Sequence, residues 1–380
     1  MPLITDENRR VDALIRETRQ SLAADIESPA DMVRLRAEWG KVEPVPILLE
    51  HRSEGADRSW AGLDIRTLLK GEDSAGVFSA HSIELVPGAG LPAHYFDETH
   101  TFLLVEDGEV ELGVGATVDR VGRYSLGYVP PRTRQQFHNR SGSVVTLTVV
   151  HSPAGAERAF TAAHDRWLDT RDADSSAYVE TLSRFGFRFD DAVLPNDNMT
   201  NTEVPELVFE LTGEGDLERL RREFAQRPPI PRLVRTTPDE FDAAGAGANR
   251  RKHLLTGDDS GGAAMINMLS ILPGPGAAPH HQPTEEEFFF IGEGSLEMTC
   301  ATETRVLGRS AFAFCPRNCT HGFRNVGGAE SRFVTLNSPA GHERTMAEVR
   351  RRKAEGVGKE QLHALGVAGG FVFHSLDALG

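Results

Sequence analysis

Apolar residues along most of this chain occur in short runs that are broken by glycine and proline. Residues 102–112 form an apolar run, a turn at Asp107-Gly108 and a second run, and residues 288–298 repeat that plan. Residues 144–150 and 332–336 are further runs of strand length. Many short strands with tight turns are typical of an all-β sandwich or barrel, and not of alternating strands and helices. We therefore predict an all-β core.

Helical spacing of apolar residues is found outside these runs. Residues 11–22 place apolar side chains on one helical face, which predicts a helix near the N-terminus. Residues 156–168 and 342–354 also have helical character, and each segment follows a Ser-Pro-Ala-Gly tetrapeptide. The stretch 194–202 is rich in Pro, Asn and Asp, so it is predicted to link two domains.

The chain contains one sequence pattern twice. When residues 67–158 are shifted forward by about 186 positions, about 25 of roughly 92 pairs are identical. Both copies end on the same Ser-Pro-Ala-Gly-x-Glu-Arg segment. We therefore predict two domains of one fold: an N-terminal helical segment (1–45), a first domain (46–193), a linker with a short helix (194–231) and a second domain with C-terminal helices (232–380).

Composition and charge narrow the class of protein. The 380 residues are 39% hydrophobic, enough for two cores of ordinary size, and no apolar run is long enough to span a bilayer. The net charge of -15 would repel nucleic acid and anionic membranes, so neither is an expected partner. Three cysteines and no apolar leader at the start favour the cytoplasm.

Two clusters in the second copy carry residues that can bind a metal. The first cluster is Gly276-x3-His280-x-Gln282-x4-Glu287-x6-Gly294, and the second is Gly308-x7-Pro316-x4-His321-x3-Asn325. They resemble the two signature motifs of the cupin superfamily, in which a His-x-His-x4-Glu run and a distant His converge on one metal ion inside a jelly-roll barrel. The resemblance covers both copies and implies two tandem jelly-roll barrels with flanking helices.

The second copy departs from that pattern at one position. Gln282 stands where most metal-binding cupins have their second histidine. Because residues two apart on a strand point the same way, His280 and Gln282 can both face the barrel interior, whereas His281 faces away. His280, Glu287 and His321 still form a facial triad with open positions, typical of non-heme iron. Gln282 could add a weak oxygen ligand or hold a bound water.

The first copy keeps little of this set. His94 aligns with His280, but the other three positions hold different residue types: Phe96 for Gln282, Thr101 for Glu287 and Gln135 for His321. His138 aligns with Arg324, and His100 falls one position before the glutamate slot. We therefore expect the first barrel to be metal-free and to shape its partner, with one divalent ion per chain.

Cysteines near His321 and phenylalanines after Glu287 offer further interpretations of this part of the chain. Cys315-x3-Cys319-x-His321 has the look of a zinc cluster, but cysteine is commonly a small buried hydrophobe. The run Phe288-Phe289-Phe290 is expected to belong to the core, although alternation allows Phe289 to line the pocket beside Glu287. Such a pocket would suit an apolar, aromatic substrate.

A narrower resemblance suggests the chemistry. The Ser-Pro-x-Gly-x-Glu-Arg segments and the tail Arg184-Phe185-Gly186-Phe187 resemble those of quercetinase-type (flavonol 2,4-dioxygenase) bicupins. The resemblance implies a mononuclear metal, molecular oxygen and a hydroxylated aromatic or enol substrate, with Glu287 as both ligand and catalytic base. Iron is the expected ion, with Mn, Ni, Co, Cu or Zn as alternatives.

Other functions fit the same residues. A cupin-type isomerase or cyclase would use the ion as a Lewis acid and consume no oxygen. A non-catalytic bicupin would bind or store a small ligand. The sequence does not decide between these classes, and it leaves open whether the protein is a homodimer.

Overall fold

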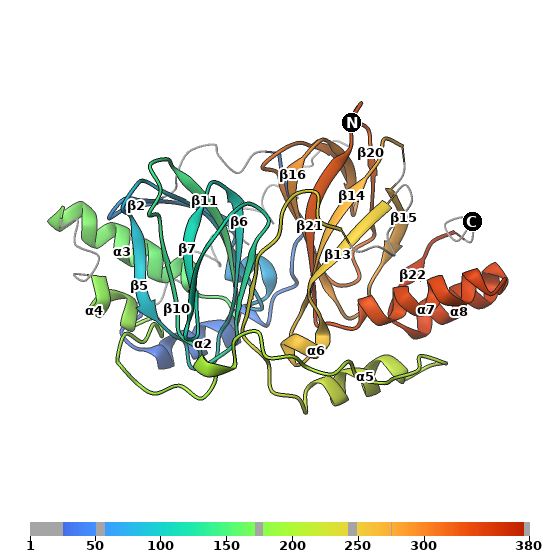
Figure 1. Cartoon of the computed structure of the whole chain (residues 1–380), viewed down its shortest axis with the longest axis horizontal. Coiled ribbons are helices and arrows are strands. Elements are labelled where there is room, and N and C mark those ends of the chain that lie inside the picture. The colour runs from blue at the N-terminus through green and yellow to red at the C-terminus, as the bar shows by residue number, and fades with distance from the viewer. Residues whose placement is uncertain (1–25, 51–57, 172–177, 242–248, 275, 376–380) are drawn as a thin grey trace, which may run out of the picture.

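The computed structural model describes residues 26–50, 58–171, 178–241, 249–274 and 276–375. Two β-sandwich units lie side by side, and the helices that follow each unit lie at the two far ends of the molecule (Figure 1). Each unit consists of a larger and a smaller antiparallel sheet. The prediction of an all-β core in two tandem jelly-roll barrels is confirmed. The helix predicted over residues 11–22 lies outside the described residues.

The first barrel is built from a seven-stranded and a four-stranded sheet. In spatial order the larger sheet contains β12 (Arg232–Val234), β9 (Leu126–Val129), β6 (His100–Asp107), β11 (Val145–Ser152), β4 (Ser79–Leu85), β3 (Leu63–Leu69) and β2 (Arg58–Trp60). The smaller sheet contains β5 (Gly90–His94), β10 (Gln135–His138), β7 (Val110–Val114) and β8 (Thr117–Val121).

The second barrel repeats this plan with a six-stranded and a five-stranded sheet. Its larger sheet contains β1 (Ile47–Leu49), β19 (Phe312–Cys315), β16 (Glu286–Glu293), β21 (Ser331–Ser338), β14 (Met265–Ile271) and β13 (Asn249–Leu255). Its smaller sheet contains β18 (Glu303–Leu307), β17 (Leu296–Cys300), β20 (His321–Asn325), β15 (Gly276–His281) and β22 (Val372–Phe373).

The helices cap the barrels and connect them. They are α2 (Pro29–Trp39), η1 (Gly71–Ser74), α3 (Ala156–Thr170), α4 (Val179–Ser183), η3 (Asp197–Met199), α5 (Asp216–Phe224), α6 (Gly257–Ser260), α7 (His342–Ala354) and α8 (Lys359–Ala368). No helix in these described segments is both long and apolar enough to cross a membrane.

Matching hydrogen bonds confirm the internal repeat. Glu157 accepts hydrogen bonds from the backbone N–H groups of Gly71 and Gly155, and Glu343 accepts the same pair from Gly257 and Gly341. These carboxylates close equivalent junctions between a barrel and the helix that follows it. The two barrels are therefore one structure built twice.

The structural repeat begins earlier in the chain than the sequence match. A helix precedes each barrel, and an arginine on it reaches the Ser-Pro-Ala-Gly turn. Arg36 of α2 donates to the carbonyl of Ala154 at 2.5 Å, and Arg221 of α5 donates to that of Ala340 at 3.0 Å. Outside the span 67–158 the sequence repeats here as well, because Arg34-Leu35-Arg36-x-Glu38-Trp39 of α2 matches Arg219-Leu220-Arg221-x-Glu223-Phe224 of α5 at an offset of 185 residues.

Both faces of the larger sheets are buried, and the two sheets pack against each other. On β16, Phe289 and Ile291 point into the second barrel, while Phe288 and Phe290 point out toward the first. The outward side chains join those of the first barrel, such as Phe102 and Leu104, in one hydrophobic cluster. A strand that buries both faces is apolar throughout, which explains the unbroken Phe-Phe-Phe run.

We expect Phe288→Ala to lower the free energy of unfolding by about 3–5 kcal/mol, the usual cost of removing a buried phenylalanine. Phe288 is fully buried, and its ring lies 5.0 Å from both Phe78 of the first barrel and Phe314 of its own. Urea denaturation measures the change. Val306→Ala, at a side chain that is 54% exposed, is the control and should cost little. Equal, small effects would contradict a shared core.

Each larger sheet ends on a strand from the other half of the chain. β1 pairs antiparallel with β19 of the second barrel, with Ile47 opposite Phe314. β12 pairs with β9 of the first barrel, with Arg232 opposite Tyr128. The boundaries predicted at 46 and 232 fall just before these strands, so each strand is grouped with one repeat while its hydrogen bonds join the sheet of the other.

Candidate metal centre

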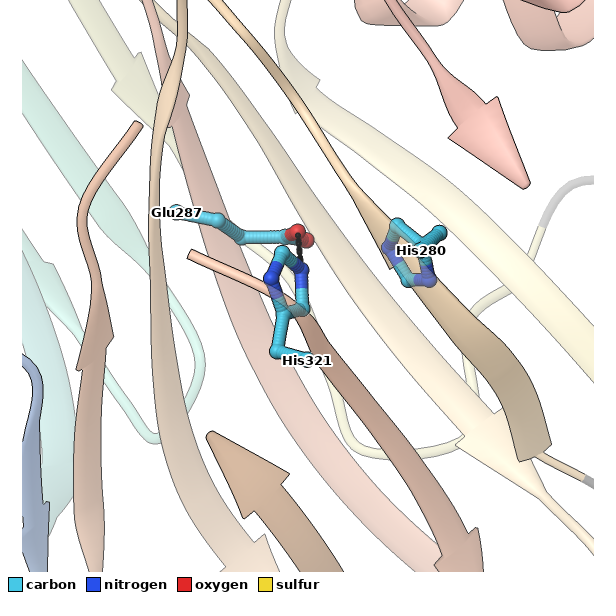
Figure 2. A group of neighbouring side chains, drawn as sticks. All are labelled: His280, Glu287 and His321. Atoms are coloured by element: carbon cyan, nitrogen blue, oxygen red, sulfur yellow. Dashed lines mark hydrogen bonds and ion pairs between the residues drawn. The ribbon is translucent and has the colours of Figure 1, made fainter. Parts of the chain in front are cut away.

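Three strands of the second barrel bring His280, Glu287 and His321 together (Figure 2). His280 on β15 and His321 on β20 are direct cross-strand partners in the smaller sheet, while Glu287 reaches them from β16 in the larger sheet. One possible ligand atom from each side chain lies within 4.8 Å of the others, and all three residues are buried.

Backbone contacts fix which nitrogen of each histidine faces the centre. Nδ1 of His280 lies 2.7 Å from the carbonyl of Ala278, and Nδ1 of His321 lies 2.9 Å from that of Cys319. A carbonyl only accepts, so each Nδ1 carries the proton and donates it. This tautomer leaves the Nε2 lone pair for a metal, an arrangement that is common around metal-binding histidines.

Glu287 contacts both His321 and Gln282 at this centre. Its Oε2 lies 3.0 Å from Nε2 of His321 and accepts a 3.0 Å hydrogen bond from the side-chain amide of Gln282. Burial alone would raise the pKa of Glu287, but the hydrogen bond and charge of His321 outweigh it and lower the pKa to about 2. The carboxylate is therefore ionised at neutral pH.

Burial and the carboxylate of Glu287 shift the pKa values of His280 and His321. Burial and the neighbouring His321 lower the pKa of His280 to about 3, so its ring is neutral and can act as a ligand. Burial would also lower the pKa of His321, but the hydrogen bond and charge of Glu287 raise it instead. Where no cation is bound, a proton shared by this pair offsets the buried negative charge.

These donors fit a divalent transition metal. Two imidazole nitrogens and one carboxylate, buried and converging from both sheets, make a three-ligand set that leaves coordination positions free. Gln282 is also brought to the centre and is buried, with its amide nitrogen turned to Glu287. In this arrangement Gln282 positions the carboxylate, and its role as a ligand stays a prediction.

A cavity of about 350 Å³ adjoins the centre. Its floor is the inner face of the larger sheet, α7 lies over one side, and the segment at β22 covers the other. His280 and Glu287 both line it, and Phe371 stacks on the His280 ring with the centroids 4.2 Å apart. A larger groove of about 770 Å³ lies between α5 and α8, but none of the predicted ligands lines it.

The Phe288–Phe290 run lies in the core, as expected, and other residues supply the aromatic lining of the cavity. Phe289 is fully buried and packs against Phe323 and Phe333 in the barrel core, so it is not a lining residue. Alternation places Phe289 on the correct face, but the core covers it. Phe323, Phe371 and Phe373 line the cavity instead.

Sequence motifs missed the polar residues around the cavity. These are Arg251, Asn267, Thr335, Asn337 and His342, which belong to β13, β14, β21 and α7. None of them belongs to a recognisable motif. The repeat does carry a signal, because the aligned positions of the first copy hold Ile65, His81, Val149, His151 and Ala156.

The corresponding place in the first barrel holds different chemistry. A hydrogen bond of 3.2 Å from Gln135 to Thr101 replaces the contact between His321 and Glu287. Phe96 packs between His94 and Phe187, and Phe160 adds a further ring. Within the described residues, the three-ligand group occurs in the second barrel alone. That the first barrel holds no metal stays a prediction.

The cysteines lie beside the centre, and their sulfurs are not part of the three-ligand group. Sγ of Cys300 lies 3.0 Å from Sγ of Cys315 and 3.3 Å from Sγ of Cys319. Cys319 contributes its backbone carbonyl to His321. The geometry therefore gives no support to a zinc cluster formed by Cys315, Cys319 and His321.

Part of the second barrel is similar in sequence to known proteins. Residues 267–337 match the family model described as Cupin domain. The matched segment lies in the second barrel and contains His280, Glu287 and His321. Over 97 residues the chain is 34% identical to the polyketide synthase CurC of Streptomyces cyaneus, a match that covers 25% of this chain and 63% of that protein. The chain thus matches less than two thirds of that relative's length.

Solved structures also align with most of the chain. Protein Ylba from E. coli aligns with 77% of this chain and 90% of its own, with a TM-score of 0.50 and 12% identity. The oxalate decarboxylase of Lactobacillus farciminis aligns over 79% and 87%, with a TM-score of 0.47 and 12% identity. At this identity the likeness to Ylba concerns the fold alone.

Proposed function

We propose that this bicupin is a metal-dependent dioxygenase that acts on a hydroxylated aromatic or enol small molecule. One divalent ion, iron, is held by His280, Glu287 and His321. The observation that carries the proposal is the buried triad of two histidines and one carboxylate, two of which line an adjoining cavity. When bound, the ion supplies open coordination positions for a substrate oxygen and for molecular oxygen.

The chain's own residues prepare the substrate in this proposal. Glu287 accepts the proton of the substrate hydroxyl, because its carboxylate lies at the cavity wall. Gln282 holds that carboxylate in place. The rings of Phe371 and Phe373 line the cavity and give the aromatic part of a substrate an apolar surface beside the reacting groups.

A second candidate is an isomerase or cyclase that uses the ion as a Lewis acid. The similarity to a polyketide synthase favours it, because polyketides carry enolisable carbonyl groups that cyclise without oxygen. Both candidates use the same centre and the same class of substrate. They differ in whether molecular oxygen is consumed.

We expect the purified protein, loaded with Fe(II), to consume oxygen when it is given polyphenols or enolisable diketones. An oxygen electrode measures uptake, and product mass shows whether oxygen atoms are incorporated. Reconstitution with Mn, Ni, Co, Cu or Zn identifies the ion that supports turnover. Substrate conversion without oxygen uptake would place the Lewis-acid reaction first, and a chain that binds no metal would favour a ligand-binding or storage role.

A further inference from the structure

A row of polar side chains crosses the inner face of the larger sheet and ends at Glu287. Asn267 on β14 lies opposite Thr335 on β21, and Asn337 lies opposite Glu287 on β16. On the neighbouring strand β13, Arg251 lies opposite Leu269, which is two residues from Asn267 and therefore on the same face of the sheet. Five polar residues line the cavity and form one wall that leads to the metal centre: Arg251, Asn267, Thr335, Asn337 and Glu287.

Several groups in this wall have no partner in the described part of the chain. Asn337 is fully buried, and neither its amide oxygen nor its amide nitrogen makes a hydrogen bond. The side-chain oxygen of Asn267 and Nη1 of Arg251 are also buried without partners. Each such group costs free energy on folding, so a wall of them indicates a polar ligand.

The charge of the cavity is opposite to that of the whole protein. The chain carries a net charge of -15, yet the cavity is lined by Arg251, Arg350 and Lys353, and Glu287 is the one carboxylate among its described lining residues. Binding of a divalent ion by Glu287 would leave the cavity more positive still. Neither Arg251 nor Arg350 forms an ion pair within the described segments.

Arg251 keeps its charge in this place. Burial, followed by the nearby charge of Arg350, lowers the pKa of Arg251 to about 10, while Glu287 and Glu343 act in the opposite direction. The guanidinium is therefore still protonated at neutral pH. Glu343 accepts hydrogen bonds from two backbone N–H groups, and no ion pair joins it to Arg251 in the described residues.

Helix α7 places the second arginine at the mouth of the cavity. His342, Met346, Val349, Arg350 and Lys353 follow helical spacing along one side of α7, and all of them line the cavity. Arg350 is exposed at the rim, whereas Arg251 is half-buried in the wall. An anion that enters past α7 meets Arg350 first and Arg251 further in.

The first barrel provides an internal comparison. Ile65 aligns with Arg251 and His164 aligns with Arg350, and His164 hydrogen bonds to the backbone of Ser59. The fold therefore forms equally well without either arginine. Both cations are particular to the barrel that carries the three metal-binding side chains, which points to a ligand and not to a requirement of the fold.

We propose that the cavity selects substrates that carry a carboxylate, which Arg251 and Arg350 bind while the phenol or enol oxygen lies at the metal centre. This inference rests on the proposed function, because it places the second end of the same substrate. A guanidinium binds a carboxylate through two parallel hydrogen bonds, a geometry that a neutral amide does not reproduce. Asn267 and Asn337 supply further polar contacts along the wall.

A matched pair of probes tests the inference. 3,4-Dihydroxybenzoate and 3,4-dihydroxybenzamide share the same two hydroxyl groups and differ only in the carboxylate. Isothermal titration calorimetry on the full chain loaded with Zn(II), which avoids turnover, should show the carboxylate binding about tenfold or more tightly than the amide. Its affinity should also fall as the salt concentration rises.

Variants assign the preference to the two arginines. Arg251→Gln should abolish most of the preference for the carboxylate while leaving the amide and the zinc content unchanged, and Arg350→Gln should reduce it less. Arg350 is exposed, so its variant tests the idea even if Arg251→Gln does not fold. Arg324→Gln is the control, because this exposed arginine pairs with Glu297 outside the cavity.

Equal binding of the two probes, equal weakening of both by Arg251→Gln, or no binding of the carboxylate at millimolar concentration would overturn the inference. These outcomes leave the proposed function standing if the protein still holds a metal and consumes oxygen. Conversely, if the wild-type chain holds no metal, the same titration on the metal-free chain shows whether the cavity prefers the carboxylate to the amide. A carboxylate preference that depends on Arg251 would then support the inference while the proposed function fails.

Discussion

His321→Ala should remove most of the bound metal, reducing the content from about one ion per chain to near zero. His321 is one of three ligands, and its Nε2 also contacts the carboxylate of Glu287. Loss of an outer partner of a ligand typically weakens metal binding about 10- to 100-fold, and loss of the ligand itself should cost more. Elemental analysis of the purified variant, after dialysis against a weak chelator, measures the effect.

The matched control for this variant is His138→Ala. His138 is a half-buried histidine on β10, the strand of the first barrel that corresponds to β20, but it belongs to no three-ligand group in the described residues. We expect its replacement to leave the metal content unchanged. Two tightly bound ions per wild-type chain, or loss of metal from the His138 variant, would show that the first barrel also binds a metal.

Glu287→Gln should lower turnover by about a hundredfold or more, the usual scale for the loss of a general base. The substitution keeps the shape of the side chain and one oxygen, but it removes the charge and the basicity. Metal content should fall less than in His321→Ala, because both histidines and Gln282 remain. Single-turnover kinetics, normalised to bound metal, separates the two effects.

A variant of the first barrel shows whether a carboxylate alone is sufficient. Thr101→Glu places a glutamate at the position that corresponds to Glu287, but Phe96 and Gln135 still occupy two of the remaining ligand positions. It should therefore create no activity and no second metal site. Full activity of metal-loaded Glu287→Gln would be evidence against the base assignment and would favour the Lewis-acid reaction.

The sequence predicted the centre better than its surroundings. His280, Gln282, Glu287 and His321 were singled out because cupin motifs fix their spacing, and the structure brings all four together. Strand pairing turns that spacing into proximity, so a local pattern was sufficient. The catalytic and ligand roles of these residues stay predictions.

The polar wall could not be predicted in the same way. Arg251 and Asn267 lie on consecutive strands, but Asn337 comes from β21, far along the chain, and the three residues meet only because of the register between β13, β14 and β21. Phe289 shows the converse limit. Alternation gives the face of a strand but not how deep along the barrel a side chain lies. The sequence therefore allowed Phe289 to line the pocket as an alternative to the core, where the structure places it.

The exchange of β1 and β12 makes the two barrels one cooperative unit. β1 closes the edge of the sheet that carries Glu287, yet it is joined along the chain to the first barrel. If the first barrel unfolded, the second would lose this strand and would expose both an unpaired sheet edge and a phenylalanine-rich face, which is a hazard for aggregation. The first barrel thereby protects the second from aggregation, because it covers the phenylalanine-rich face and supplies the strand that pairs with the sheet edge.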